Sequence, residues 1–466
     1  MPNRANIAPL MPKRICYWFV GLAAIGLLLR VALFTHYEPI MQPDTSTYVS
    51  AAQDLVSGGG FAKSEGRRTP GYPLLIAAIG EDPARIVVTQ MALGVGTSLL
   101  LFLITLQLTG RPGMAFAIGL SYDLNLQQLF IEAVVVTEPL TTFLLAAMTA
   151  TLLPTLQWLR ARSGAAALAV ATGVLGATAI MVRPQFVFLV LLLPLLVGYA
   201  ASGPRWPGGR ALRHAALVAL PIGVALLGWA KVVQHNTGYF ALSTQSGFGL
   251  VNHSVEFIEL APKEYATVRD ILLKYRAERI AAAGHAGNTV WYAWPEIQRA
   301  TGWSLPEASR QLQRMSMQMF EDHPVRYAQS VMRAWLEFWT VPIFLEPDRL
   351  SPTWLAQPLE RVWWVEHTLL RLCNLLFVTF LVAVAVSRRV RNAVRWDLNA
   401  TAIGALVMCS SLLQAMADRG AGSRYAITLQ AMVVLLIIVT LARARTGGRR
   451  RAPTDAAPAS EPIAGS

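Results

Sequence analysis

The sequence has little charge and very little cysteine. Only 14% of its 466 residues are charged, whereas 54% are hydrophobic, and the mean hydropathy is +0.44. This composition excludes an ordinary water-soluble domain, because so much apolar surface is stable only where most of it faces lipid. All three cysteines, Cys16, Cys373 and Cys409, lie in apolar stretches, where packing is expected rather than disulfide bonds or metal ligation.

Several catalytic and nucleotide-binding motifs are also missing. The sequence contains no H-E-x-x-H, no P-loop, no G-x-G-x-x-G after a strand and no G-x-S-x-G. It therefore carries no signature of a zinc protease, a nucleotide-binding enzyme or a serine hydrolase. The seven histidines are scattered without ligand spacing. A divalent cation held by His253 or His285 with an acidic partner stays open.

Long apolar runs dominate what is present. A helix needs about 20 apolar residues to span a bilayer, because all its backbone polar groups must be satisfied internally. The first run continues to about Phe34 without a clear cleavage site, so it is expected to be a retained helix rather than a signal peptide. About ten spans are predicted, near 15–36, 86–108, 113–131, 135–158, 165–182, 184–201, 214–234, 366–387, 398–416 and 424–442.

Lysine and arginine are unevenly divided between the segments that join these spans. Eighteen lie in one set of segments, at positions 4, 13, 14, 111, 160, 162, 205, 210, 213, 388, 389, 391, 395, 443, 445, 449, 450 and 451. The short loops of the other set hold seven, at positions 63, 67, 68, 85, 183, 419 and 424. Positive residues favour the cytoplasm, so both termini are predicted to be cytoplasmic. The net charge of +13 therefore reflects membrane topology and predicts no nucleic-acid partner.

The expected domain organisation follows from these runs. Residues 1–234 form an N-terminal membrane bundle with an outer first loop at 37–85, and residues 365–445 form C-terminal membrane helices. Between them, 235–364 is rich in charge and tryptophan and has helical runs at 262–282 and 305–337, so it is predicted to be a folded, mostly helical outer region. Its tryptophans, with Trp363 and Trp364, suit the membrane interface or a sugar surface. The tail, 446–466, is predicted to be disordered.

The first outer loop carries more chemistry than a simple connection needs. It reads PDTSTYVSAAQDLVSGGGFAKSEGRRTPGYP over residues 43–73. Asp44 suits the N-cap of a helix beginning near Ser46, and the glycines at 58–60 suit its end. Arg67 and Arg68 precede a rigid Pro-Gly-Tyr-Pro turn. A carboxylate and two cations are thus placed at the mouth of an apolar bundle.

Several short patterns follow in a recognisable order. They are the first-loop segment with RTPGYPLLIA, VVVTEPLTTFLL (134–145), VRPQFVFL (182–189), EDHPVRYAQSVMRAWLEFW (321–339) and SRYAITLQAMVVLL (423–436). In this order the chain resembles the multi-spanning GT-C glycosyltransferases, in the branch related to protein O-mannosyltransferases and aminoarabinose transferases. The resemblance implies an enzyme that takes a sugar from a polyprenyl-phosphate carrier on the outer face of the membrane.

The resemblance implies roles for particular residues. Asp44 matches the acidic first-loop residue that serves as catalytic base, since a carboxylate can accept the proton of an attacking hydroxyl. Many members carry a second acidic residue beside it, and here Thr45 stands instead, which leaves a paired-carboxylate or metal role open. The expected substrate-binding residues are Arg30, Arg67, Arg68, Tyr72, Glu138, Arg183, Arg424 and Tyr425.

Each of these roles has a structural alternative. Arg67 and Arg68 suit solvated loop arginines as well as phosphate contacts. Arg30, near the outer end of the first span, either snorkels to the lipid head groups or lines the cavity beside Asp44. The helix dipole alone accounts for Glu138 at a helix start. Snorkelling is also the alternative for the two arginines Arg183 and Arg424.

The sequence thus predicts an α-helical polytopic glycosyltransferase of a bacterial inner membrane, with a periplasmic site. Its partners would be a polyprenyl-phosphate-linked sugar and a glycan, lipid or protein acceptor. The absence of a nucleotide-binding signature agrees with a lipid-linked donor. A ligase or polymerase of lipid-linked glycans and a non-catalytic lipid or glycan transporter are the alternatives. A transporter is expected to carry broken helices or inverted repeats, and neither is clear in this sequence.

Overall fold

The structure is a computed structural model that describes residues 13–61, 64–161, 165–203, 208–420 and 422–449. Over these residues the regular elements are helices, α1 to α19 with short 3-10 helices η1 to η5, and the only strand-like pairings are two isolated bridges. Eight helical segments are long and apolar enough to cross a membrane. The chain is therefore an α-helical multi-pass membrane protein.

The eight segments match eight of the predicted spans. They are α1 (Lys13–His36), α4 (Pro83–Thr109), α7 (Glu138–Arg160), η1 with α9 (Pro184–Phe188, Leu189–Ser202), α10 (Gly209–Thr237), η5 with α16 (Thr353–Leu355, Ala356–Val386), α18 (Leu398–Ala417) and α19 (Gly422–Arg449). In α19 the apolar part is Arg424–Arg445. The helix continues to Arg449, into the predicted disordered tail, and residues 450–466 lie outside the described part of the chain.

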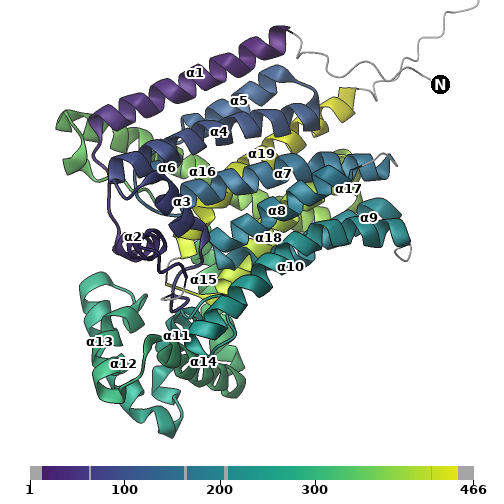
Figure 1. Cartoon of the computed structure of the whole chain (residues 1–466). Coiled ribbons are helices and arrows are strands. Elements are labelled where there is room, and N and C mark those ends of the chain that lie inside the picture. The colour runs from purple at the N-terminus through teal and green to yellow at the C-terminus, as the bar shows by residue number, and fades with distance from the viewer. Residues whose placement is uncertain (1–12, 62–63, 162–164, 204–207, 421, 450–466) are drawn as a thin grey trace, which may run out of the picture.

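The other two predicted spans are shorter helices. The segment 113–131 is divided into α5 (Pro112–Asp123) and α6 (Leu126–Glu132), because the Asn125 side chain accepts a hydrogen bond from the Gln128 N–H and starts a new helix. The segment 165–182 is α8 (Ala166–Val182), a 17-residue helix packed against α7 and α10. Both lie within the bundle in Figure 1.

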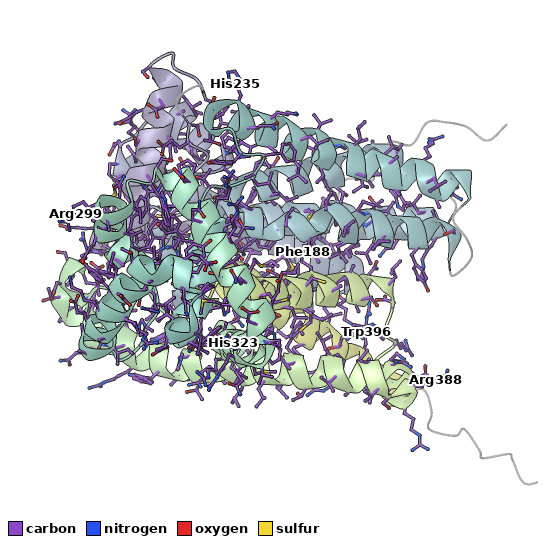
Figure 2. All side chains as sticks on the ribbon, turned by 90° about the horizontal axis from the view of Figure 1, so that it is seen from below. Phe188, His235, Arg299, His323, Arg388 and Trp396 are labelled. Atoms are coloured by element: carbon purple, nitrogen blue, oxygen red, sulfur yellow. The ribbon has the colours of Figure 1, made fainter. Side chains whose placement is uncertain are left out.

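The non-spanning elements α2, α3 and α11 to α14 gather at one end of the bundle. Figure 1 shows α2 (Pro43–Val56), α3 (Gly71–Ile79) and helices α11 to α14 at this end, which we call the site end. The opposite end holds α17 (Arg388–Ala393), the start of α1 and the end of α19. In Figure 2, Arg388 and Trp396 lie at that opposite end, far from Arg299. Both ends of the described chain therefore face away from the site end.

A second hydrophobic core lies at the site end, outside the bundle. It is formed by α11 (Ser246–Ser254), η2 (Val255–Leu260), η3 (Lys263–Tyr265), α12 (Ala266–Ala283), α13 (Thr289–Thr301) and α14 (Leu305–Asp322). Trp291 stacks on Phe248 with ring centres 4.4 Å apart, and Trp294 meets the same ring edge-on. These two tryptophans therefore pack, partly buried, against this core.

The rest of the outer region packs on the membrane helices. The predicted run 305–337 is broken after α14, and α15 (Pro324–Phe338) lies against α18 and α19. The Trp335 indole N–H donates to the Ser411 hydroxyl on α18 at 3.2 Å. Beyond α15, η4 (Pro347–Arg349) brings the chain back to the first loop, where Tyr37 forms an antiparallel bridge with Leu350. This region thus closes over the helix ends from which the first loop emerges.

The turn at Gly71 fixes the first loop against α8. A Cβ atom on Gly71 would lie 2.8 Å from the backbone of Met181 and 2.7 Å from the Val182 side chain. The predicted rigid turn is therefore also a close backbone contact, next to Arg183 at the end of α8. By contrast, a Cβ atom on Gly223 in α10 would meet no atom within 4 Å.

Gly71→Ala is expected to destabilise the protein by about 1–3 kcal/mol, as overpacking against a fixed backbone does. Gly223→Ala is the matched control and is expected to be neutral or slightly stabilising, because alanine favours a helix. Thermal unfolding of both variants in detergent measures the difference. Equal melting temperatures for the two variants would show that the Gly71 contact is not tight in the protein.

Candidate functional site

A short backbone pairing brings the first loop to the start of α7. The Ile40 N–H donates to the Ala133 carbonyl oxygen at 3.0 Å, and the Val135 N–H donates to the Ile40 carbonyl oxygen at 2.9 Å. The Thr45 hydroxyl adds a bond of 2.8 Å to the Val135 carbonyl oxygen. Ile40 and Thr45 lie close to Asp44 in the sequence, and Val135 lies three residues before Glu138. The pairing therefore brings the two carboxylates together.

Asp44 lies in the first turn of α2 but does not cap the helix. The N-cap is Gln42, whose backbone N–H donates to the Thr45 hydroxyl at 2.9 Å. The Asp44 carboxylate instead accepts from two guanidinium groups: Arg68 Nη2 lies 2.6 Å from Oδ1 and Arg424 Nη1 lies 3.1 Å from Oδ2. The side chain remains 39% exposed, so other molecules can reach this carboxylate.

Arg68 is oriented by α2 itself. Its Nε donates to the Thr47 hydroxyl at 2.8 Å and its Nη1 to the Tyr48 hydroxyl at 3.2 Å, while its guanidinium lies 4.5 Å from the centre of the Tyr48 ring. Neither Thr47 nor Tyr48 was predicted from the sequence. Their spacing of three and four residues from Asp44 is the signal that could have found them, because such residues share a helix face.

Arg67 behaves differently from its neighbour. Its side chain is exposed, and its guanidinium lies 5.9 Å from the centre of the Trp291 ring in the outer region. Burial and the neighbouring Arg68 charge lower the pKa of Arg67, yet the group stays cationic. Arg67 thus forms no ion pair with a residue that the structure describes, and it lies close enough to Asp44 for the two charges to interact.

Glu138 anchors the other half of the cluster. Its side chain is 0% exposed and is paired with two arginines: Arg424, which also contacts Asp44, and Arg183, whose Nη1 lies 3.0 Å from Oε1. Arg183 in turn lies over the Tyr425 ring, 4.5 Å from its centre. Four of the expected site residues therefore meet at the rim of the bundle, and snorkelling is wrong for both arginines.

The charges alternate along this chain of contacts. Arginines at positions 68, 424 and 183 alternate with carboxylates at positions 44 and 138, so the cluster carries one excess positive charge even without Arg67. Three helices also begin here, since Asp44, Glu138 and Arg424 lie in the first turns of α2, α7 and α19. Helix N-termini and excess guanidinium charge together favour an anion.

The electrostatic setting keeps Asp44 ionised. Burial opposes its ionisation, but Arg68 and then Arg424 outweigh burial and hold the pKa of Asp44 below its ordinary value. A carboxylate with a lowered pKa is charged at neutral pH and is a weak proton acceptor while both arginines hold it. It becomes a stronger base when another anion takes over one of those arginines.

Tyr72 was predicted to bind substrate, and its surroundings are structural. The side chain is 0% exposed, and its hydroxyl donates to the Gln90 side-chain oxygen at 2.7 Å. The Gln90 amide group in turn donates to the Glu132 and Val134 carbonyl oxygens at 2.9 and 2.7 Å. The Tyr72 ring supports Tyr48 edge-on at 5.1 Å. Tyr72 therefore holds the site from beneath and offers no surface to a substrate.

Arg30 lies in a different cluster. It is 2% exposed, so it does not snorkel, and it does not contact Asp44. Its Nη1 lies 2.7 Å from Asp123 Oδ1, and its Nε and Nη2 lie 2.7 and 2.9 Å from the two Glu132 oxygens. Both carboxylates are 0% exposed. This triad could not be predicted from the sequence, since Asp123 and Glu132 lie 93 and 102 residues after Arg30.

The donor set at Asp44 does not fit a resident metal ion. In the described ranges no group of three or more His, Cys, Asp or Glu side chains is placed to hold one. His253 is buried beside Phe320 and Tyr327, with its Nδ1 2.9 Å from the Ser330 hydroxyl. Burial and then the Arg419 charge lower the pKa of His253 to about 4. His253 thus packs as a neutral core residue.

Comparison with protein-family models and with curated proteins finds no match.

The two carboxylates of the cluster are expected to differ in their contribution to stability. Glu138→Gln removes the fully buried anion that Arg183 and Arg424 share, and breaking such a buried pair costs about 3–5 kcal/mol. Asp44→Asn removes a carboxylate that is itself 39% exposed, and Arg424 keeps Glu138 as a partner, so a much smaller loss is expected. Thermal unfolding in detergent compares the two variants. A larger loss for Asp44→Asn would contradict the burial pattern.

Proposed function

We propose that the protein is a membrane glycosyltransferase that moves a sugar from a polyprenyl-phosphate carrier to a hydroxyl of a glycan, lipid or protein acceptor. The observation that carries this proposal is the accessible Asp44 carboxylate held between Arg68 and Arg424. A base and a phosphate-binding group are thus side by side at the end of an apolar bundle. The sequence resemblance to GT-C enzymes supports the same reading.

The donor's phosphate group fits the excess charge of the cluster. A polyprenyl phosphate keeps its isoprenoid chain in the membrane, so its phosphate reaches the rim of the bundle where Arg68, Arg424 and the exposed Arg67 lie. Guanidinium groups bind phosphate in a two-pronged geometry, and the first turns of α2, α7 and α19 add partial positive charge. These groups also stabilise the negative charge that develops on the leaving phosphate.

The proposed reaction is a single displacement at the anomeric carbon. The acceptor hydroxyl gives its proton to an Asp44 oxygen as the acceptor oxygen forms a bond with that carbon. The bond between the anomeric carbon and the phosphate oxygen breaks, and its electron pair stays on the phosphate. Inversion at this carbon follows from the GT-C resemblance alone. Arrival of the phosphate draws Arg68 or Arg424 away from Asp44, which strengthens the base when it is needed.

The proposed location is a bacterial inner membrane with the site end in the periplasm. The unequal division of arginine between the two sets of linking segments supports this orientation. Both ends of the described chain would then be cytoplasmic. A lipid-linked donor suits the periplasmic side, because nucleotide sugars are not available there.

Asp44→Asn is expected to lower transfer from a polyprenyl-phosphate sugar by about 10²–10⁴-fold, the usual contribution of a general base. The assay incubates purified protein with a panel of radiolabelled polyprenyl-phosphate sugars and an envelope-lipid acceptor mixture. Binding of the donor is expected to be retained, because the arginines remain. Asp54→Asn, on the same helix as Asp44, is the matched control and is expected to keep full activity.

Two outcomes would contradict the proposal. Full activity in Asp44→Asn would show that Asp44 is not the catalytic base. No turnover of any monophosphate donor by well-folded wild type would show that the donor is not a polyprenyl-phosphate sugar. Transfer of an intact oligosaccharide from a diphosphate carrier would instead support a ligase or polymerase. Movement of a lipid-linked glycan across vesicles without any transfer would support a transporter.

Arg67→Gln is expected to raise the KM for the donor about two- to five-fold with little change in kcat, since exposed ion pairs contribute about 0.2–1 kcal/mol. The effect should shrink as salt is added, because exposed charges are screened. Steady-state kinetics at low and high salt measure it, with Arg85→Gln as the exposed control on α4. An unchanged KM would show that Arg67 does not contact the donor.

A further inference from the structure

The triad of Arg30, Asp123 and Glu132 does not balance its charge. One guanidinium faces two carboxylates, and all three side chains are at most 2% exposed. Arg30 lies six residues before the end of α1, which is about 9 Å of helix, so the triad lies inside an apolar span. A net negative charge in such a place is very costly, and buried carboxyls usually avoid it by binding a proton.

Glu132 accepts more hydrogen bonds than Asp123. Glu132 accepts from Arg30 Nε and Nη2 at 2.7 and 2.9 Å and from the Tyr122 hydroxyl at 3.4 Å. Asp123 accepts one bond of 2.7 Å, from Arg30 Nη1 to Oδ1, and its Oδ2 is buried without a partner in the described part of the chain. The ionised form is therefore well stabilised on Glu132 and poorly stabilised on Asp123.

The two carboxyl groups pack closely against glycines of neighbouring helices. A Cβ atom on Gly94 of α4 would lie 2.1 Å from Glu132 Oε1, and one on Gly26 of α1 would lie 2.9 Å from Asp123 Oδ2. The glycines thus make room for the carboxyl groups, and each arginine contact is a direct hydrogen bond. A proton needs no further volume and fits this close packing.

We propose that the triad is a proton-binding site in the membrane bundle, with one proton held on Asp123 Oδ2 at neutral pH and the negative charge held on Glu132. The titratable and charged groups around Asp123 are Arg30 on α1, Tyr122 on α5 and Glu132 on α6. From α4 come Gly94, the Ser98 hydroxyl and the Gln90 amide, and none of these titrates. The site is separate from the Asp44 cluster and does not depend on the proposed reaction.

The proton has a structural consequence. A carboxyl that is protonated in the folded protein and ionised in the unfolded chain favours the folded state at low pH, and this contribution is lost as pH rises through the folded-state pKa. Asn is nearly the same shape as a protonated Asp. Asp123→Asn should therefore keep the fold at neutral pH and remove the alkaline loss of stability.

The experiment measures thermal unfolding of the full chain in detergent between neutral and alkaline pH. Wild type is expected to lose stability as pH rises, Asp123→Asn to match it at neutral pH with a flatter profile, and Glu132→Gln to be strongly destabilised at all pH values. Asp54→Asn, at a half-buried position on α2 outside the triad, serves as the control. If Asp123→Asn is instead as damaging as Glu132→Gln, or keeps the wild-type alkaline slope, the assignment is overturned. A stability that depends on sodium concentration would overturn it as well.

Infrared spectroscopy tests the same site without relying on stability. A protonated carboxyl group has a C=O stretching band distinct from that of a carboxylate. Wild type at neutral pH should show this band, and its intensity should fall in Asp123→Asn but not in Asp54→Asn. An unchanged band in Asp123→Asn would show that Asp123 is ionised.

Discussion

The arrangement of the site depends on charges that must be neutralised where water is scarce. Arginines at the rim of a bilayer need partners, and here three of them are shared between two carboxylates in an alternating chain. The buried Glu138 satisfies two arginines and fixes their positions. Asp44 completes the chain but stays partly open to solvent. Within this cluster Glu138 is therefore a structural carboxylate, whereas Asp44 is accessible to other molecules.

Each member of the cluster comes from a different part of the chain, and local packing brings the members together. The pairing of Ile40 with 133–135 places α2 beside the start of α7. The close contact of Gly71 with α8 places the first loop beside Arg183. The α18–α19 connection is held from outside, where the Asn252 amide group donates to Asp418 at 2.7 Å, six residues before Arg424. The outer region thus contributes to the position of an arginine that it does not touch.

Much of the membrane architecture could be predicted from the sequence. Apolar runs of sufficient length identify spanning helices directly, and eight of the ten predicted spans have the required length. The run 113–131 was predicted as one span but forms two helices, because Asn125 caps a new helix within an apolar stretch. Hydropathy alone does not reveal such a cap. The packing of the α13 tryptophans on Phe248 could not be predicted, because a composition rich in tryptophan does not show which core the rings join.

The candidate site could be predicted only in part. Arginines and carboxylates at predicted helix ends indicated the rim, and five of them, from Asp44 to Arg424, do meet there. Which ones meet depends on long-range packing. Arg30 looked equivalent to Arg183 in the sequence, yet its helix face directs it to Asp123 and Glu132. Tyr72 lies in a suggestive motif, but its hydroxyl is used by Gln90 beneath the site.

The central claim is that the rim cluster is an anion site for a lipid-linked phosphate. The most direct measurement compares binding of a polyprenyl phosphate with that of the polyprenol of the same chain length to the purified protein. We expect the phosphate to bind at least about ten-fold more tightly, roughly the 1.5 kcal/mol minimum of a hydrogen bond to a charged group, and Arg68→Gln to remove most of this preference. Equal binding of the two lipids, or a preference that survives in Arg68→Gln, would contradict it.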